Sequence, residues 1–375
     1  MNDARDILRA LVAIPSVSMQ SNEAVIEYAR RYFSPEAWQV DLYEYKDGAG
    51  IRKMNLVAEF RCQGPAVPEL AFVCHTDTVP FDPSWAEALR PAEQEGNLYG
   101  RGSCDVKGFL ACILQSIEGL RAGALRTPLA VVLTADEEIG RVGMKHLATA
   151  GAVRARRAIV GEPTGLRPVR GGKGYGLGEI VVRGKEAHSA YPARGRSAIL
   201  DAARVVLALE DVSAGLMSHP SPGFDPPYTT VNAGLIQGGT AKNIVPGECR
   251  IVVEWRPVPG EAADLVPTRI ARELSRLQEA FPGFNAEFHV SRFDLPFAPS
   301  ASDELASFLT ELTGHAPAMV SFGSEAAHIP AEEVVVFGPG DMTTAHRTGE
   351  FVPLEELALC VRCLTACIHR FCGRV

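Results

Sequence analysis

The sequence predicts an α/β protein in which a mostly parallel sheet has helices on both faces and a smaller α+β domain interrupts the chain. Four valine-rich apolar runs, at 70–74, 129–134, 158–160 and 334–337, have the length of strands. They do not alternate with polar residues, which is typical of strands buried on both faces of a parallel sheet. Helical patterns such as residues 109–123 lie between them, and this repeated order predicts an α/β sandwich.

The middle of the chain has a different pattern. Residues 177–190 and 228–260 show period-two alternation with Gly and Pro punctuation, which predicts a sheet with one solvated face. A chain of 375 residues also exceeds what one compact core usually organises. We therefore expect 177–292 to form an inserted domain, so that 1–176 and 293–375 make up one discontinuous main domain.

The composition is that of an ordinary globular protein, with 46% hydrophobic and 22% charged residues. The net charge of −8 argues against nucleic acid or an anionic membrane as a partner. No run reaches about 18 apolar residues, so no membrane span is expected. The N-terminal segment lacks the layout of a signal peptide and predicts an amphipathic helix with Ile7, Leu8, Leu11 and Val12 on one face. These features predict a cytoplasmic protein.

Nine cysteines is an odd count, and their spacing matches no disulfide framework. Cys360 and Cys363 have a spacing that metal sites use. Together with Cys367 they also follow the spacing of one helix face within residues 354–371. Free cysteine is a common buried residue, so a core helix is the favoured interpretation.

Polar groups that bind metals or protons follow each of the four apolar runs. In chain order they are His75 and Asp77, then Asp136, Glu137 and Glu138, then Glu162, and finally His346. In open parallel sheets, ligands bind beyond the carboxyl ends of the strands. Four strands that deliver histidines and carboxylates to one edge therefore predict a single site.

Asp105 is a fifth candidate, in the glycine-rich stretch 99–108. It suits a metal ligand and the N-cap of the following helix equally well. If it bridges two metals, each metal receives one histidine, one terminal carboxylate and the shared aspartate. The full set would be His75, Asp105, Glu138, Glu162 and His346. Nitrogen and oxygen ligands with open positions suit catalytic Zn²⁺, with Co²⁺ or Mn²⁺ as alternatives.

Asp77 and Glu137 are close in the sequence to these candidate ligands but are not part of the ligand set. Asp77 is two residues from His75, on the same side of an extended chain, so it suits the carboxylate that orients a ligating histidine. Glu137 adjoins a ligand and suits the general base for a metal-held water. The alternative for 136–138 is a solvated acidic turn.

Five ordered motifs, VCHTDTVP, GRGSCDVKG, TADEEIG, VGEPT and FGPGDMTTAH, resemble those of the di-zinc aminoacylase and exopeptidase family. The resemblance covers essentially the whole chain. It implies two Zn²⁺ ions, one held by His75 and Glu162 and the other by Glu138 and His346, with Asp105 as the bridge. It also implies a metal-binding α/β domain interrupted by a smaller lid that often forms a homodimer.

Motifs of the inserted domain also resemble the family lid. The resemblance implies that His188, in 184–199, polarises the scissile carbonyl from its own or a neighbouring subunit, and that Asn243 and Arg256 bind substrate. A surface histidine and a structural salt bridge are the alternatives for His188 and Arg256. The chain departs from the family at Glu254, where Asp is usual, and at Ser197, where Asn is usual.

Within the family, GRGSCDVKG and the stretch 321–330 look most like acetylornithine deacetylases. The resemblance implies a small N-acyl amino acid substrate, with N2-acetylornithine converted to ornithine and acetate in arginine biosynthesis. Glu325 is then expected to face the substrate ammonium, with an N-cap acid of the following helix as the equally favoured alternative. Succinyl-diaminopimelate desuccinylase, acetylcitrulline deacetylase and a related aminoacylase or dipeptidase are competing functions. A family-like binding protein with an inactive site and a nucleotide-binding protein are weaker alternatives.

Overall fold

The computed structural model describes residues 3–63 and 66–373, and the chain forms two compact units. The main unit contains 1–170, 299–318 and 324–375, and the inserted unit contains 171–298 and 319–323. The inserted unit is therefore wider than the expected 177–292. Among the described residues, no helix combines the length and the apolarity that a bilayer span requires.

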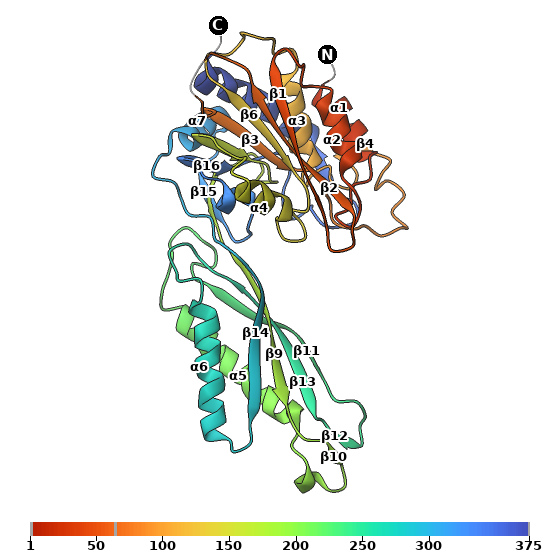
Figure 1. Cartoon of the computed structure of the whole chain (residues 1–375), viewed down its shortest axis with the longest axis vertical. Coiled ribbons are helices and arrows are strands. Elements are labelled where there is room, and N and C mark those ends of the chain that lie inside the picture. The colour runs from red at the N-terminus through yellow and green to blue at the C-terminus, as the bar shows by residue number, and fades with distance from the viewer. Residues whose placement is uncertain (1–2, 64–65, 374–375) are drawn as a thin grey trace. The chain divides into compact units, whose positions relative to one another are not determined.

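The large sheet has the strand order β1-β2-β6-β3-β7-β16-β8-β15. Figure 1 labels β1, β2, β3, β6, β15 and β16 of this sheet. The bounds of its strands are β1 Trp38–Lys46, β2 Arg52–Phe60, β3 Leu70–His75, β6 Leu129–Thr134, β7 Arg157–Val160, β8 Val169–Gly172, β15 Ala318–Val320 and β16 Glu333–Val336. The four neighbours β6, β3, β7 and β16 are parallel, whereas β1, β2 and β6 pair in antiparallel fashion. The four expected strands are therefore confirmed as the parallel centre of the sheet.

The sequence prediction did not include β1 and β2. β1 lies at the edge of the sheet, and its residues are mostly exposed or half-buried. It therefore lacks the continuous apolar run that identifies a strand covered on both faces.

The parallel strands are covered on both faces. Leu70, Phe72 and Cys74 of β3 belong to the main hydrophobic core, and Ala71 and Val73, which point to the opposite face, are buried as well. The helices of the main unit are α1 Ala4–Val12, α2 Glu23–Arg30, α3 Lys107–Ile117, α4 Val142–Thr149, α7 Glu304–Thr313 and α8 Leu354–Cys367. Helices α1, α3 and α8 pack on one another in that core.

The C-terminal cysteines belong to this core. Cys360, Cys363 and Cys367 lie on α8, and Cys372 lies in the π-helical turn Ile368–Cys372 (η3) that follows. All four are buried in the apolar cluster. The predicted core helix is confirmed, because apolar packing and not metal ligation accounts for this cysteine spacing.

Short elements complete the main unit. A three-stranded sheet has the order β17-β5-β4, with β4 Ala92–Gln94, β5 Asn97–Tyr99 and β17 Phe351–Pro353. The 3₁₀ turn η2 spans Glu325–His328. Strand β5 leads into the loop that carries Asp105, and β17 follows the loop that carries His346.

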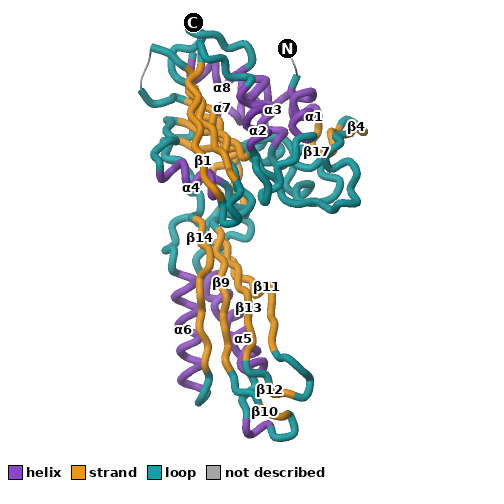
Figure 2. Tube along the Cα trace, turned by 45° about the vertical axis from the view of Figure 1, so that its right-hand side comes forward, coloured by secondary structure: helices purple, strands orange, loops and turns teal. Residues whose placement is uncertain are grey.

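The inserted unit is the predicted α+β domain. Its antiparallel sheet has the order β11-β13-β9-β14, and α5 and α6 bury their apolar faces against one side of it (Figure 2). The bounds are β9 Tyr175–Arg183, β11 Thr230–Gly238, β13 Glu248–Arg256, β14 Asn285–Asp294, α5 Ala198–Leu216 and α6 Leu265–Ala280. A small pair, β10 Ala187–His188 and β12 Ile244–Val245, and the 3₁₀ turn η1 Pro192–Arg194 extend it. The expected boundary at 292 falls inside β14, which continues to Asp294.

Candidate metal centre and active site

The candidate site lies at the carboxyl edge of the parallel strands of the main unit. His75 is the last residue of β3, and Glu162 follows β7 by two residues. Glu138 lies in the turn after β6, His346 lies in the loop after β16, and Asp105 precedes α3. Parallel strands end at a common edge, so residues far apart in the sequence come together here.

Asp105 is the centre of this group. Its Oδ1 atom lies 3.1 Å from His75 Nε2, and its Oδ2 atom lies 3.1 Å from His346 Nε2. His346 Nε2 is also 3.1 Å from Oε1 of Glu138. Two ligand groups result, His75–Asp105–Glu162 and Asp105–Glu138–His346, and within each group the ligand atoms lie within 4.8 Å of one another.

These residues fit two divalent cations. Burial raises the pKa of Glu138 to about 7, and the nearby Asp105 carboxylate adds to the rise. Burial, together with Asp105, also raises the pKa of Glu162 well above its ordinary value. Three carboxylates in so small a space repel one another, and bound cations would relieve that repulsion. Each group also combines a histidine with carboxylates, which are the ligands of catalytic zinc, cobalt and manganese sites.

The N-cap alternative for Asp105 does not fit the local structure. The N-cap of α3 is Val106, and no side chain caps this helix. The Asp105 carboxylate instead contacts the two histidines. Burial pushes the pKa of Asp105 upward, but hydrogen bonds to His346 and His75 outweigh it and hold the pKa of this carboxyl below its ordinary value. The contacts therefore favour the ligand interpretation.

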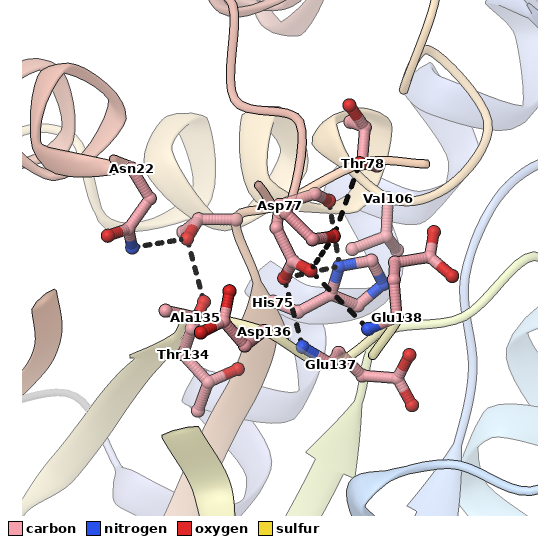
Figure 3. A network of polar contacts seen from close by, with 12 residues as sticks. Asn22, His75, Asp77, Thr78, Val106, Thr134, Ala135, Asp136, Glu137 and Glu138 are labelled. Atoms are coloured by element: carbon pink, nitrogen blue, oxygen red, sulfur yellow. Dashed lines mark hydrogen bonds and ion pairs between the residues drawn. The ribbon is translucent and has the colours of Figure 1, made fainter. Parts of the chain in front are cut away.

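Asp77 contacts His75 and the turn after β6 at the same time (Figure 3). His75 Nδ1 lies 3.1 Å from the backbone carbonyl oxygen of Asp77, whereas the Asp77 carboxylate is 3.7 Å away. Both groups of Asp77 thus lie next to the same ring nitrogen, and the backbone carbonyl is the closer of the two. The carboxylate accepts hydrogen bonds from the Ser18 hydroxyl at 2.7 Å and from the backbone N–H groups of Glu137 at 3.1 Å and Glu138 at 3.4 Å.

Glu137 is buried in the same turn, and its carboxylate points away from Asp77 (Figure 3). Oε1 of Glu137 accepts a hydrogen bond from Arg141 Nε at 3.0 Å. The sequence interpretation did not include Arg141, although an arginine four residues after an acid is a recognisable pair. The charged guanidinium holds the carboxylate of the candidate base in one orientation.

Asp136 begins this turn with a positive φ of 57° and is not a solvated residue. Its Oδ1 accepts a hydrogen bond from Lys53 Nζ at 2.7 Å, and its Oδ2 accepts one from the Tyr45 hydroxyl at 2.8 Å. Lys53 and Asp136 are both 1% exposed. The acidic turn is therefore bound to the sheet, and the alternative of a solvated surface turn does not fit it.

Glu325 lies at the start of η2 and is 1% exposed. Burial raises the pKa of Glu325 to about 8, and nearby Glu137 adds to the rise. Among the described residues, no hydrogen bond of regular geometry reaches either carboxylate oxygen, and the nearby Thr134 hydroxyl opposes the rise in the pKa of Glu325. Both oxygens are therefore buried without a regular hydrogen bond from the described part of the chain.

The three remaining candidates belong to the inserted unit. His188 is exposed on β10, and the backbone N–H of Ser189 donates to the Asn243 carbonyl at 3.0 Å, so His188 and Asn243 are neighbours. Arg256 lies at the far end of β13 from Asn243. It forms an ion pair with Glu254 at 2.7 Å, and its guanidinium carbon lies 4.6 Å from the ring centre of Tyr175.

The family model of peptidase family M20/M25/M40 matches residues 71–370. The chain belongs to this family. An acetylornithine deacetylase of Myxococcus xanthus is 46% identical over 100% of both chains. An acetylornithine deacetylase of Klebsiella pneumoniae (strain 342) is 31% identical and covers 98% of this chain and 97% of its own. The aminopeptidase PepT of Bacillus cereus has the same fold, with a TM-score of 0.77, 22% identity and coverage of 98% of both chains.

Membership of family M20 agrees with the resemblance found in the motifs. The family consists of metal-dependent hydrolases, and this M20 chain has its candidate ligands in two adjoining groups that share one aspartate. The predicted fold class and the predicted metal-dependent amide hydrolase are thereby confirmed.

Proposed function

We propose that this M20 enzyme hydrolyses the amide bond of N2-acetylornithine, releasing ornithine and acetate for arginine biosynthesis. The observation that carries the proposal is the 46% identity to an acetylornithine deacetylase over the full length of both chains. The arrangement of His75, Asp105, Glu138, Glu162 and His346 supports the same chemistry. The metal ligands alone would serve any N-acyl amino acid, so the choice of acetylornithine rests on the identity to the deacetylase and on Glu325.

Two bound Zn²⁺ ions, or Co²⁺ in their place, would polarise the acyl carbonyl and lower the pKa of the attacking water. The five ligands would hold these ions, and Asp77 would orient His75 through its backbone carbonyl. Glu137 accepts a proton as the water adds to the acyl carbon and then donates it to the amine nitrogen as the C–N bond breaks. The acyl product keeps the oxygen and the second hydrogen of the water as acetic acid, which then ionises to acetate.

Residues of the inserted unit are proposed to complete substrate binding. His188 would donate to the oxygen of the acyl group, in its own or in a second subunit, as negative charge develops there. Asn243 would add a hydrogen bond to the substrate. Arg256 presents a planar fork that suits the substrate α-carboxylate, which would compete with Glu254 for the guanidinium.

Glu325 is proposed to recognise the side-chain ammonium of ornithine. It is a buried carboxyl group with two unpaired oxygens, and a buried cation is the partner that would favour its charged form. Because the pKa of Glu325 is about 8 without such a partner, substrate binding would draw the proton from this group. An N-acyl amino acid with an uncharged side chain would not stabilise the charged form of Glu325 in this way.

A homodimer through the inserted unit is also proposed. β11 is an edge strand of its sheet, and Leu235 and Ile236 on it are 61% and 53% exposed. Helix α5, which packs beside β11, exposes Leu200 and Leu207. An unpaired edge next to exposed apolar side chains suits pairing with a second copy.

A cytoplasmic location is proposed as well. The nine cysteines are free thiols, which agrees with a reducing compartment.

Hydrolysis of a substrate panel tests this function. The purified enzyme is stripped of metal with a chelator, then supplied with Zn²⁺ or Co²⁺ and assayed on N-acetyl, N-succinyl and N-formyl amino acids. We expect activity only with metal, and a kcat/KM for acetylornithine at least about tenfold above the others, which is about 1.4 kcal/mol. A preference for succinyl-diaminopimelate, acetylcitrulline or a dipeptide would reassign the substrate. Failure to hydrolyse any amide with metal bound would overturn the proposal.

A further inference from the structure

Glu350 is a fully buried carboxylate that the proposed mechanism does not use, four residues after His346. Its Oε1 atom accepts hydrogen bonds from the backbone N–H groups of Cys104 and Asp105, both at 3.0 Å. Its Oε2 atom forms an ion pair with the buried guanidinium of Arg101. One side chain therefore connects the segment of His346 to the backbone of Asp105.

The backbone of Glu350 holds the same loop. Its carbonyl oxygen accepts a hydrogen bond from the N–H of Gly100 at 3.0 Å, and the Ser103 hydroxyl lies within 3.4 Å of the same oxygen. The antiparallel pairing of β17 with β5, which sets Phe351 opposite Tyr99, brings Glu350 to Gly100. The loop 100–105 is therefore bound at several points by one residue.

Asp105 has a demanding geometric role. Its two oxygens lie 3.1 Å from nitrogens of two different histidines, His75 and His346. An aspartate side chain is short, so the position of its backbone decides where both oxygens lie. Sites of this kind tolerate displacements of only about 0.5 Å.

We propose that Glu350 is a positioning residue that holds the backbone of Asp105 so that its two carboxylate oxygens face both metal positions at once. The inference rests on the proposed role of Asp105 as the shared ligand. Removing the charge of Glu350 is therefore expected to weaken metal binding, although Glu350 itself belongs to neither candidate ligand group.

Glu333 provides a matched control. It is 1% exposed and accepts hydrogen bonds from two consecutive backbone N–H groups, those of Leu305 at 3.0 Å and Ala306 at 3.1 Å. These groups start α7 and belong to neither candidate ligand group. Glu333→Gln thus removes the charge of a buried carboxylate that accepts two backbone hydrogen bonds, as Glu350→Gln does, at a place unrelated to the metal site.

The test uses the full chain, stripped of metal and titrated with Zn²⁺ alone against a competing chelator. Glu350→Gln should lower metal affinity about 10- to 100-fold, and Glu333→Gln should leave it at the wild-type value. The visible absorption of the Co²⁺-loaded protein should change in Glu350→Gln only. Thermal unfolding of the metal-free variants measures the structural effect of each change separately. Wild-type affinity in Glu350→Gln, or an equal loss in Glu333→Gln, would overturn the proposal.

Two further variants test the assignment of Asp105 as a ligand and provide a second change at Glu350. Asp105→Asn should lose metal binding by itself, and if it binds metal normally, the ligand assignment fails and the inference fails with it. Glu350→Asp keeps a negative charge opposite Arg101 but is too short to reach both backbone N–H groups. Because the hydrogen bonds to these N–H groups carry the proposed role, this variant should also lower metal affinity, and it replaces Glu350→Gln if that variant does not fold. Wild-type affinity in Glu350→Asp would then reject the role of Glu350.

Discussion

The carboxylate of Asp77 accepts a hydrogen bond from the backbone N–H of Glu137 at 3.1 Å, so the residue two positions after the candidate ligand His75 also holds the turn of the candidate base. The two residues come from the ends of neighbouring parallel strands, β3 and β6. A displacement of Asp77 would therefore move the candidate metal ligand and the candidate base together.

Glu137→Gln tests the role of the base. Glutamine has nearly the same shape but cannot accept the proton, so kcat should fall about 10²- to 10⁴-fold. Zinc content, measured by elemental analysis, should stay at the wild-type level, because Glu137 belongs to neither ligand group. Glu355→Gln, an exposed change on α8, serves as the control. Near-normal turnover in Glu137→Gln would contradict the mechanism.

Asp77→Asn tests the coupling of ligand and base. The amide keeps one acceptor oxygen but loses the charge that binds the Glu137 and Glu138 N–H groups. We expect a loss of about 10- to 100-fold in kcat or in metal affinity. Ser18→Ala removes only one hydrogen bond to the carboxylate and should cost about 1 kcal/mol of unfolding free energy in urea. If the two variants had equal effects on kcat, the special role of the carboxylate would be refuted.

Lys53→Met tests the buried clamp on Asp136. It leaves the Asp136 carboxylate without its cation, so the free energy of unfolding should fall by about 3–5 kcal/mol. Tyr45→Phe removes one hydrogen bond to the other oxygen and should cost only about 1 kcal/mol. Denaturant unfolding of the metal-free proteins measures both values. Wild-type stability in Lys53→Met would show that the pair contributes nothing.

Glu325→Gln tests substrate recognition. The change removes the negative charge, so KM for acetylornithine should rise about tenfold or more, whereas N-acetylnorleucine, which lacks the ammonium, should be affected little. Steady-state kinetics with both substrates separate recognition from a general loss of activity. Unchanged KM and kcat for acetylornithine would remove Glu325 from recognition.

Leu235→Glu tests the proposed dimer surface on β11. A charge on an edge strand opposes pairing with a second copy, so the mass measured by light scattering should fall to that of one chain. Val290→Glu, on β14 at the other edge of the same sheet, is the matched control, since Val290 is 46% exposed. A wild-type protein that already elutes as a monomer would reject the dimer.

The sequence by itself determined the four parallel strands, the helix of buried cysteines and the identity of the candidate ligands. Each of these features can be recognised within one short segment, because an apolar run and the polar residues that follow it are contiguous in the chain. His75 and Glu162 could thus be recognised from the strands that precede them, before the order of the strands in the sheet was known.

Which residues hold the site in place depends on the tertiary structure. The register that pairs Leu56 of β2 with Leu133 of β6, continued by three residues, sets Lys53 against Asp136, 83 positions away in the chain. The pairing of β17 with β5 likewise brings Glu350 to Asp105 across 245 positions. Neither polar residue stands out in its own segment. Their roles arise from burial, because a charge removed from water requires a partner, and only the order of the strands supplies one.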